Sequence, residues 1–233
     1  MKAVILAGGL GTRLKPFTEV IPKPLLPVGE KAILEVQIEH LKKYGFNEIF
    51  LATNYKSDYI ENFFGDGSKY GVELYISKED KPLGTVGPLS LIKERLGNEP
   101  FLVMNGDILT KCDFSKLYKF GLAIDSDLIV GIKEFFTPFR FGNIFFNEDY
   151  VTRIEEKQDI KTNILSGIYI MKPGIFEYIK YNESLSMDVL INSMLKKKSK
   201  IAKYLIKEYW LDIGVVEDYK EVQEVYNNHF KDE

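Results

Sequence analysis

The sequence predicts an α/β fold: a Rossmann-like, mainly parallel sheet flanked by helices, with partly antiparallel strands in its second half. Five apolar or small residues in a row, at 3–7, are typical of a buried parallel strand, and a loop with three glycines follows them directly. Through the first half, short apolar runs typical of strands alternate with segments whose apolar residues have helical spacing, which indicates βαβ units. From residue 127 onward, strand-like runs follow one another through short links, which favours antiparallel pairing.

The first half supplies the parallel elements. Apolar side chains at 33, 34, 38 and 41 share one helical face, and Gly45 ends that helix. Strands are predicted at 48–53, 72–77 and 101–104. Helices are predicted from Ser57, as the cap, to residue 64 and from 84 to 95.

The second half is predicted to contain strands at 128–133, 141–146, 151–156 and 165–171, then helices at 186–196 and 216–227. No repeat or Gly/Pro/Ser-rich linker marks a boundary. We therefore expect one domain over residues 1–233 with two subregions, about 1–125 and about 126–233.

Composition narrows the class of protein. The 233 residues carry a formal net charge of -3, which does not favour a general nucleic-acid or membrane-surface binder. The single Cys112 fits a reducing compartment, and the first apolar run is too short to span a bilayer. We expect a soluble cytoplasmic protein. The lysines at 196–200 are interpreted as a solvated helix end.

The glycine-rich loop indicates phosphate binding. Glycine lacks a Cβ, so a loop with Gly8, Gly9 and Gly11 can present backbone N–H groups to an anion at close range. Arg13 and Lys23 would add the positive charge that a nucleoside triphosphate needs. The pattern matches neither a P-loop nor the dinucleotide-binding fingerprint, whose third glycine is replaced by Leu14. A plain strand-to-helix turn is the alternative interpretation.

The segment at 6–18, followed by Pro-Lys-Pro-Leu-Leu-Pro-Val at 22–28, resembles the opening of the sugar-1-phosphate nucleotidyltransferases. The resemblance continues at 84–85, 105–107, 156–157 and 210–214, so it covers almost the whole chain. It implies a GT-A-like nucleotidyltransferase fold. It also implies an enzyme that converts a nucleoside triphosphate and a sugar 1-phosphate to an NDP-sugar and pyrophosphate.

The same resemblance assigns the catalytic groups. Asp107 follows a buried strand, where ligands lie in open α/β sheets, and Asp212 follows Trp-Leu. Similar enzymes use these two aspartates to hold Mg²⁺, so both are expected metal ligands, and Asp107 is expected to be catalytic together with Arg13 and Lys23. Without the resemblance, each aspartate could be an ordinary turn or cap residue.

Further residues take binding roles by the resemblance. The segment at 81–88 resembles a base-reading loop in which Thr85 opens a helix. The expected nucleotide-binding residues are Leu6, Ala7, Gly8, Gly9, Gly11, Thr12, Arg13, Pro82, Gly84 and Thr85. The expected sugar-phosphate-binding residues are Lys23, Gly142, Glu156, Lys157 and Asn163.

The second subregion departs from the family at three positions that bear on sugar recognition. Phe141 replaces a tyrosine, Gln158 replaces a proline, and Leu165 replaces a sugar-binding asparagine. Asn163 lies close to that last position in sequence. The Glu156–Lys157 pair could also be an exposed ion pair of little energetic value.

The segment at 84–89 most resembles mannose-1-phosphate guanylyltransferase-type members, which implies GTP with mannose, glucosamine or heptose 1-phosphate. A thymidylyl-, uridylyl- or cytidylyltransferase remains open, as does a non-catalytic nucleotide- or sugar-binding regulatory subunit. A glycosyltransferase is disfavoured because Asn-Gly-Asp at 105–107 lacks the Asp-x-Asp pattern. A homodimer or higher homo-oligomer is a hypothesis drawn from the same family.

Overall fold

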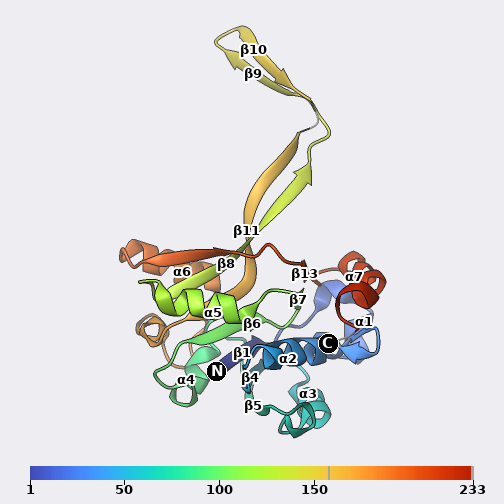
Figure 1. The fold of residues 1–233 in the computed structure, drawn as a ribbon, viewed down its shortest axis with the longest axis vertical. Helices are drawn as coiled ribbons and strands as arrows, with labels where there is room; N and C mark the ends of the chain where they lie inside the picture. Colours follow the sequence, from blue (N-terminus) through green and yellow to red (C-terminus); the bar gives the residue numbers. More distant parts are fainter. Residues whose placement is uncertain (157, 232–233) are drawn as a thin grey trace.

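A seven-stranded sheet forms the centre of the molecule, in the order β12-β8-β11-β6-β1-β4-β5. The computed structural model describes residues 1–156 and 158–231 (Figure 1). The parallel part contains β1 (Lys2–Leu6), β4 (Glu48–Thr53), β5 (Glu73–Lys78) and β6 (Phe101–Asn105). Then β11 (Asp159–Met171) runs antiparallel to both β6 and β8 (Leu128–Pro138), and β12 (Ile201–Leu205) runs parallel to β8. The predicted fold class is confirmed.

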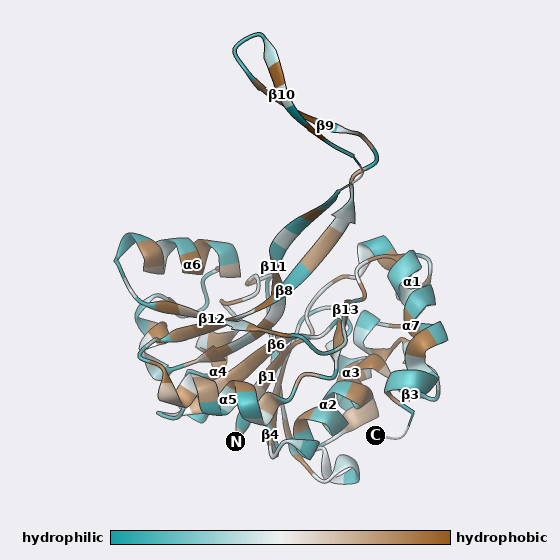
Figure 2. Cartoon of the chain, turned by 45° about the horizontal axis from the view of Figure 1, so that its top comes forward, coloured by the Kyte–Doolittle hydropathy of each residue, from teal (hydrophilic) through white to brown (hydrophobic). Residues whose placement is uncertain are grey.

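Helices cover both faces of this sheet. One apolar cluster joins Ala3 and Ile5 to α2 (Ile33–Lys43), α3 (Ser57–Phe64) and α5 (Phe114–Ala123). The opposite face joins Val4 to α4 (Leu89–Leu96) and α6 (Met187–Lys196). Alternate residues of β1 therefore enter opposite cores, which explains why its whole run is apolar (Figure 2).

A third apolar cluster packs the end of the chain against its beginning. Here α7 (Val216–His229) brings Val222 and Tyr226 to Leu14 and Val28. The small elements around this cluster are α1 (Phe17–Val20), β2 (Pro27–Val28), β3 (Lys31–Ala32), β7 (Ile108–Thr110) and β13 (Trp210–Asp212). Four 3-10 turns complete the described chain, at Thr12–Leu14, Lys23–Leu25, Ser68–Tyr70 and Pro173–Glu177.

Some predicted boundaries are wrong. The helix predicted from residue 84 begins only at Leu89, because Gly84 has φ +74° and a proline at 88 disfavours helical backbone in the residue before it. Ser57 does not cap α3; it is the first helical residue, after Lys56 at φ 55°. Helix α5 and strand β12 were not predicted.

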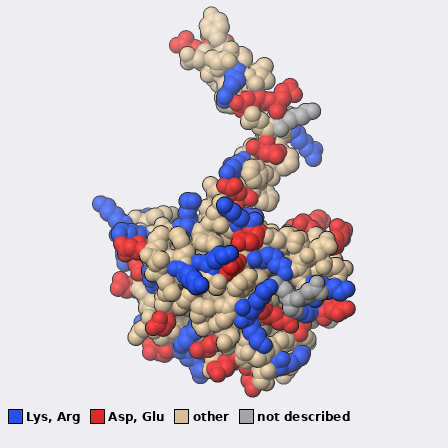
Figure 3. All heavy atoms as spheres, viewed as in Figure 1, with Lys and Arg blue, Asp and Glu red and all other residues tan. Residues whose placement is uncertain are grey.

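A long extension leaves the body between β8 and β11. The outer parts of these strands stay paired beyond the sheet, and a separate two-stranded sheet of β9 (Asn143–Asn147) and β10 (Tyr150–Glu155) lies at their end. Figure 3 shows that this extension stands clear of the body and carries charges of both signs. No helix within the described ranges is long and apolar enough to cross a membrane.

Candidate active site

The glycine-rich loop begins where β1 ends, and packing fixes its shape. Ala7 N–H donates to the Ala52 carbonyl at 2.8 Å, and the Thr18 hydroxyl donates to the Gly11 carbonyl at 2.8 Å. Gly11 has φ +61°, and a Cβ there would lie 2.7 Å from Cγ2 of Thr18. Only glycine fits this position without strain.

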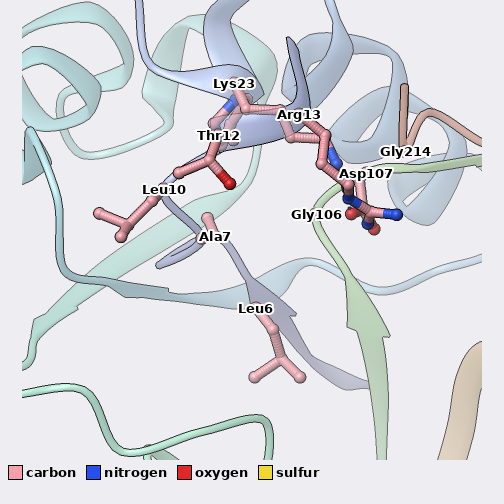
Figure 4. Close-up of a pocket in the computed structure, with 12 residues that line it drawn as sticks. Leu6, Ala7, Leu10, Thr12, Arg13, Lys23, Gly106, Asp107 and Gly214 are labelled. Atoms are coloured by element: carbon pink, nitrogen blue, oxygen red, sulfur yellow. Dashed lines mark hydrogen bonds and ion pairs between the residues drawn. The ribbon is translucent and has the colours of Figure 1, made fainter. Parts of the chain in front are cut away.

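Two cavities open on either side of this loop, and together they contain every residue predicted to bind nucleotide. One, of about 300 Å³, includes Leu6, Ala7, Gly9, Gly11, Thr12 and Arg13 in its wall (Figure 4). The other, of about 390 Å³, includes Gly8, Pro82, Gly84 and Thr85. The two walls share four residues, so the cavities adjoin along them: Leu6, Gly9, Leu10 and Asp107.

Asp107 and Lys23 form an ion pair. The turn after β6 carries Asp107, and Lys23 Nζ donates to its Oδ2 at 2.6 Å. Lys23 is buried. The other oxygen of Asp107, Oδ1, is also buried, but it has no hydrogen-bond partner among the described residues. A buried carboxylate oxygen without a partner is unfavourable unless a ligand satisfies it.

Asp212 is brought beside Asp107 by a short antiparallel ladder. Strand β13 pairs with β7, which places Asp212 opposite Ile108, and Ile213 N–H donates to the Asp107 carbonyl at 2.9 Å. Partial loss of water around the carboxyl, followed by the charge of Asp107, raises the pKa of Asp212 to about 6, against the influence of Lys23 and Arg13. The two predicted aspartates therefore lie close enough for their charges to repel.

Arg13 supplies further positive charge at the same cavity. Figure 4 shows its side chain extending toward Asp107 and Gly214. A Cβ built on Gly214 would lie 3.5 Å from Arg13 Nη2, an ordinary contact distance, so the guanidinium lies directly against this part of the backbone. The Asp218 carboxylate accepts from Gly214 N–H and Val215 N–H, both at 2.8 Å, and so fixes the backbone beneath Arg13.

At this site, Asp107 and Asp212 are the carboxylates that could hold a divalent cation. In the part of the chain that the structure describes, no three His, Cys, Asp or Glu side chains cluster as a metal site. Two carboxylates supply too few ligands for a closed protein site. Mg²⁺ is commonly bound by one or two carboxylates together with water and substrate phosphates, and the donor set at Asp107 and Asp212 has that character.

Gln37 positions the turn that carries Asp107, a role that sequence analysis missed. Its Nε2 donates to the Asn105 carbonyl at 3.0 Å and to the Ile108 carbonyl at 2.7 Å. Gln37 is 2% exposed and lies on α2, whose apolar residues predicted the helix. No local pattern distinguishes it from a surface glutamine, because both of its partners lie about 70 residues away.

We expect Gln37→Met to destabilise the chain and to lower turnover. Methionine keeps the length of the side chain but leaves two carbonyls without their donor, at a cost of about 2 kcal/mol in the free energy of unfolding. Turnover should fall more than KM rises, because the Asp107 carboxylate loses its fixed position. Urea denaturation and steady-state kinetics measure the two effects. Unchanged values in both would show that Gln37 does not position the turn.

Glu79 and Asn54 also contribute to the 390 Å³ cavity and were not predicted. Glu79 Oε2 accepts from Leu83 N–H at 2.9 Å, and Oε1 lies 3.1 Å from where a Gly8 Cβ would be. Burial raises the pKa of Glu79, while the Leu83 N–H and Asn54 act in the opposite direction. A carboxylate is thus held on the wall of the cavity that also contains Gly84.

The prediction that Thr85 opens a helix is wrong, because α4 begins at Leu89. The hydroxyl oxygen of Thr85 accepts from Met187 N–H at 2.9 Å, and Val86 N–H donates to the Leu185 carbonyl at 2.9 Å. Gly84 approaches the same segment closely, since a Cβ there would lie 2.7 Å from the Leu185 oxygen. The loop is therefore fastened to the start of α6.

Of the residues predicted to bind the sugar phosphate, Lys23 lies in the wall of the 300 Å³ cavity, but Gly142, Glu156 and Asn163 lie away from both cavities. Gly142 and Glu156 lie near each other at the base of the β9–β10 hairpin, where a Cβ on Gly142 would be 3.9 Å from Glu156 Oε1. Asn163 stands opposite Glu134 in the ladder between β11 and β8. None of these three lies in the wall of either cavity, and Lys157 is outside the described residues.

Comparison with known proteins agrees with this geometry. The profile described as nucleotidyl transferase matches residues 2–229. A D-glycero-alpha-D-manno-heptose 1-phosphate guanylyltransferase of Campylobacter jejuni is 37% identical over 94% of this chain and 97% of its own length. The mannose-1-phosphate guanylyltransferase catalytic subunit beta of Xenopus tropicalis is 32% identical over 94% of this chain and 62% of its own.

The fold of this chain also resembles that of a solved structure. HddC from Yersinia pseudotuberculosis, complexed with GMP-PN, has a TM-score of 0.76 at 31% identity and covers 97% of this chain and 99% of that one. The chain spans 63% of the length of three similar proteins from Oryza sativa subsp. japonica. From the profile match and the heptose-phosphate relative together, the chain belongs to the nucleotidyl transferase family.

Proposed function

We propose that the protein joins the nucleotidyl group of GTP to a sugar 1-phosphate and releases pyrophosphate. One observation carries the proposal: Arg13, Lys23 and Asp107 line the 300 Å³ cavity beside the glycine-rich loop, and Asp212 lies close enough for the charges of these three residues to act on its pKa. Transfer between two phosphorylated reactants needs anions brought together in line and the developing charge stabilised. Backbone amides and two cationic side chains suit that task.

The chain's own residues act by binding and positioning. Loop N–H groups and Arg13 hold the triphosphate, and Lys23, fixed by Asp107, meets the incoming sugar phosphate. An oxygen of the sugar phosphate forms a bond to the α-phosphorus as the bond from that phosphorus to the pyrophosphate oxygen breaks. Arg13 stabilises the charge that passes to the departing pyrophosphate.

Asp107 and Asp212 would hold Mg²⁺ in this proposal. The unpartnered Oδ1 of Asp107 and the raised pKa of Asp212 fit a site that gains from a cation, and the all-oxygen donors suit Mg²⁺. When bound, Mg²⁺ neutralises phosphate oxygens and so lowers the barrier to in-line attack.

Glu79 supports guanine as the base. Guanine presents an N–H and an adjacent amino group on its pairing edge, and a carboxylate accepts from both. The Glu79 carboxylate is held on the wall of the 390 Å³ cavity, which does not include Lys23 or Arg13. Uracil, thymine and cytosine lack two adjacent donors of this kind.

Relatives named for mannose and heptose 1-phosphates support these sugars as acceptors.

The proposal includes a cytoplasmic location, since the single Cys112 is a buried thiol, and a product that feeds cell-surface polysaccharide synthesis. A catalytically idle regulatory subunit would not need two neighbouring carboxylates, one of which has a buried oxygen without a hydrogen-bond partner among the described residues.

Pyrophosphate release from GTP, ATP, UTP, CTP and dTTP, each with mannose, heptose, glucosamine and glucose 1-phosphates, tests the proposal. We expect GTP with a manno-configured phosphate to give the highest kcat/KM. Glu79→Gln should lower kcat/KM for GTP by about 10- to 100-fold, because one acceptor oxygen becomes a donor. A pyrimidine triphosphate preferred by the unaltered enzyme would refute the guanine assignment, and no release with any pair would refute the reaction.

A further inference from the structure

The side chain of Lys56 reaches from the start of α3 to the end of α1. Its Nζ donates to the Glu19 carbonyl at 2.6 Å and to the Val20 carbonyl at 2.8 Å. These two residues end α1, and the last carbonyls of a helix have no partner within the helix. A cation at that end also interacts favourably with the helix dipole. A helix of four residues is too short to be stable alone, so the position of α1 depends on such contacts.

The backbone of Lys56 has a conformation that lysine rarely adopts. Its φ of 55° and ψ of 35° lie in the left-handed region, where a residue with a Cβ is strained. Glycine would precede α3 in this conformation at a lower cost. Strained residues persist where the surrounding structure holds them, and they cluster at functional sites. The two hydrogen bonds from Nζ are what lysine adds at this position.

Helix α1 in turn fixes the glycine-rich loop that precedes it. Thr18, the second residue of α1, is buried, and its hydroxyl donates to the Gly11 carbonyl at 2.8 Å. Gly11 lies in the wall of the 300 Å³ cavity together with Thr12 and Arg13. A displacement of α1 would therefore also displace the part of the loop that is proposed to hold the triphosphate.

The segment at 54–56, which follows β4, also lies against the start of the loop. A Cβ built on Gly8 would lie 3.4 Å from the Cβ of Asn54, two residues before Lys56. Asn54 and Gly8 both belong to the wall of the 390 Å³ cavity. This segment thus contacts the loop where it leaves β1 and again at its far end, through α1.

Apolar packing holds the start of α1 but not its end. The first residue, Phe17, meets Tyr219 of α7 with ring centres 5.4 Å apart, and α1 lies beside α7 (Figure 1). Val20 and Ile21, at the other end, are 72% and 39% exposed. The hydrogen bonds from Lys56 therefore act where apolar contacts are weakest.

We propose that Lys56 is a positioning residue for nucleotide binding. Its two hydrogen bonds, called the clamp here, hold α1 so that the glycine-rich loop keeps its triphosphate-binding conformation before the nucleotide binds. The inference rests on the proposed function, which assigns this loop to the triphosphate of GTP. When the binding-competent conformation is only partly populated, the ligand binds more weakly in proportion. Loss of the clamp should raise KM for GTP roughly 5- to 20-fold with little change in kcat, because the clamp acts on binding rather than on the chemical step.

Three variants separate the clamp from the stability of the fold. Lys56→Gly removes the ammonium and also relieves the strained φ, so the chain should stay about as stable as the unaltered protein. Lys56→Met removes the ammonium and keeps most of the side chain. Lys198→Gly is the matched control, because Lys198 also has a left-handed φ, of 60°, but is exposed just after α6 and lies in the wall of neither cavity. Thermal unfolding checks the stability of all three variants.

Steady-state pyrophosphate release and hydrogen exchange measure the effect of the clamp. We expect the rise in KM for GTP with both Lys56 variants and not with the control. Hydrogen exchange needs no turnover. The Glu19 N–H donates to the Pro16 carbonyl at 3.1 Å, and the Ile21 N–H donates to the Phe17 carbonyl at 3.3 Å. These two amides should exchange faster in both Lys56 variants and at the unaltered rate in the control.

Unchanged KM and unchanged exchange in both Lys56 variants would overturn the proposal, as would equal changes in the control. A raised KM with Lys56→Gly alone would overturn it too, because the ammonium would then not be the cause. So would a raised KM without faster exchange, since the loop would then not have been released. If the unaltered protein releases no pyrophosphate with any substrate pair, the proposed function fails, whereas faster exchange confined to residues 14–21 would still support the clamp.

Discussion

Asp107→Asn is expected to lower turnover by about 100- to 1,000-fold while the chain stays folded. Asparagine keeps the shape of the side chain but removes the charge that fixes Lys23 at 2.6 Å and that would hold Mg²⁺. The loss should fall mainly on kcat, because the charge matters most when the bond to pyrophosphate breaks. Steady-state pyrophosphate release and thermal unfolding measure the two parts of this prediction.

Asp125→Asn is the matched control for that experiment. Asp125 is exposed and pairs with Lys200 on the surface, so its loss should alter neither turnover nor stability noticeably. Full turnover in the Asp107 variant, with the control also unchanged, would contradict a catalytic role for Asp107.

Asp212 should make cation binding strongly dependent on pH. Its pKa is raised to about 6 without a cation, so below pH 6 a proton occupies the carboxyl and competes with Mg²⁺. We expect the apparent Mg²⁺ affinity to fall by up to about tenfold per pH unit below 6, since ligands must be deprotonated to bind. Calorimetric titration with Mg²⁺ and a GTP analogue, between pH 5 and pH 8, measures this slope.

The same raised pKa predicts an effect of Asp212→Asn on stability. A carboxyl whose folded pKa exceeds its unfolded value of 3.8 binds more protons when folded, so its contribution to stability is lost as pH rises to about 6. Without Mg²⁺, the variant should therefore melt at a higher temperature than the unaltered protein at pH 8 and at a similar temperature near pH 4. Mg²⁺ should then stabilise only the unaltered protein. A variant that melts lower at pH 8 would contradict this account of Asp212.

The positions of the residues around the glycine-rich loop could be predicted because local sequence determines them. The buried run at β1, the glycine at position 11 and the strand before Asp107 each leave a pattern over a few residues. Glu79, Asn54 and Gln37 leave none, since their roles depend on partners brought close by the whole fold. Thr85 was misread as opening a helix because its hydrogen bond reaches the start of α6, about 100 residues away.

The segment predicted to bind the sugar phosphate could be predicted only as strands. Strand-like runs joined by short links predicted strands at 141–146 and 151–156, and β9 and β10 lie within a residue or two of those bounds. The direction in which the hairpin projects depends on how far β8 and β11 stay paired beyond the sheet. That length, and hence the distance of Gly142 and Glu156 from Asp107, is a property of the ladder that no short pattern encodes.

A crystal structure of the protein with Mg²⁺ and a non-hydrolysable GTP analogue would test the central claim most directly. We predict one ion bound at about 2.1 Å by carboxylate oxygens of both Asp107 and Asp212 and by phosphate oxygens of the nucleotide. An ion held by the phosphates alone, with either carboxylate turned away from it, would contradict the claim.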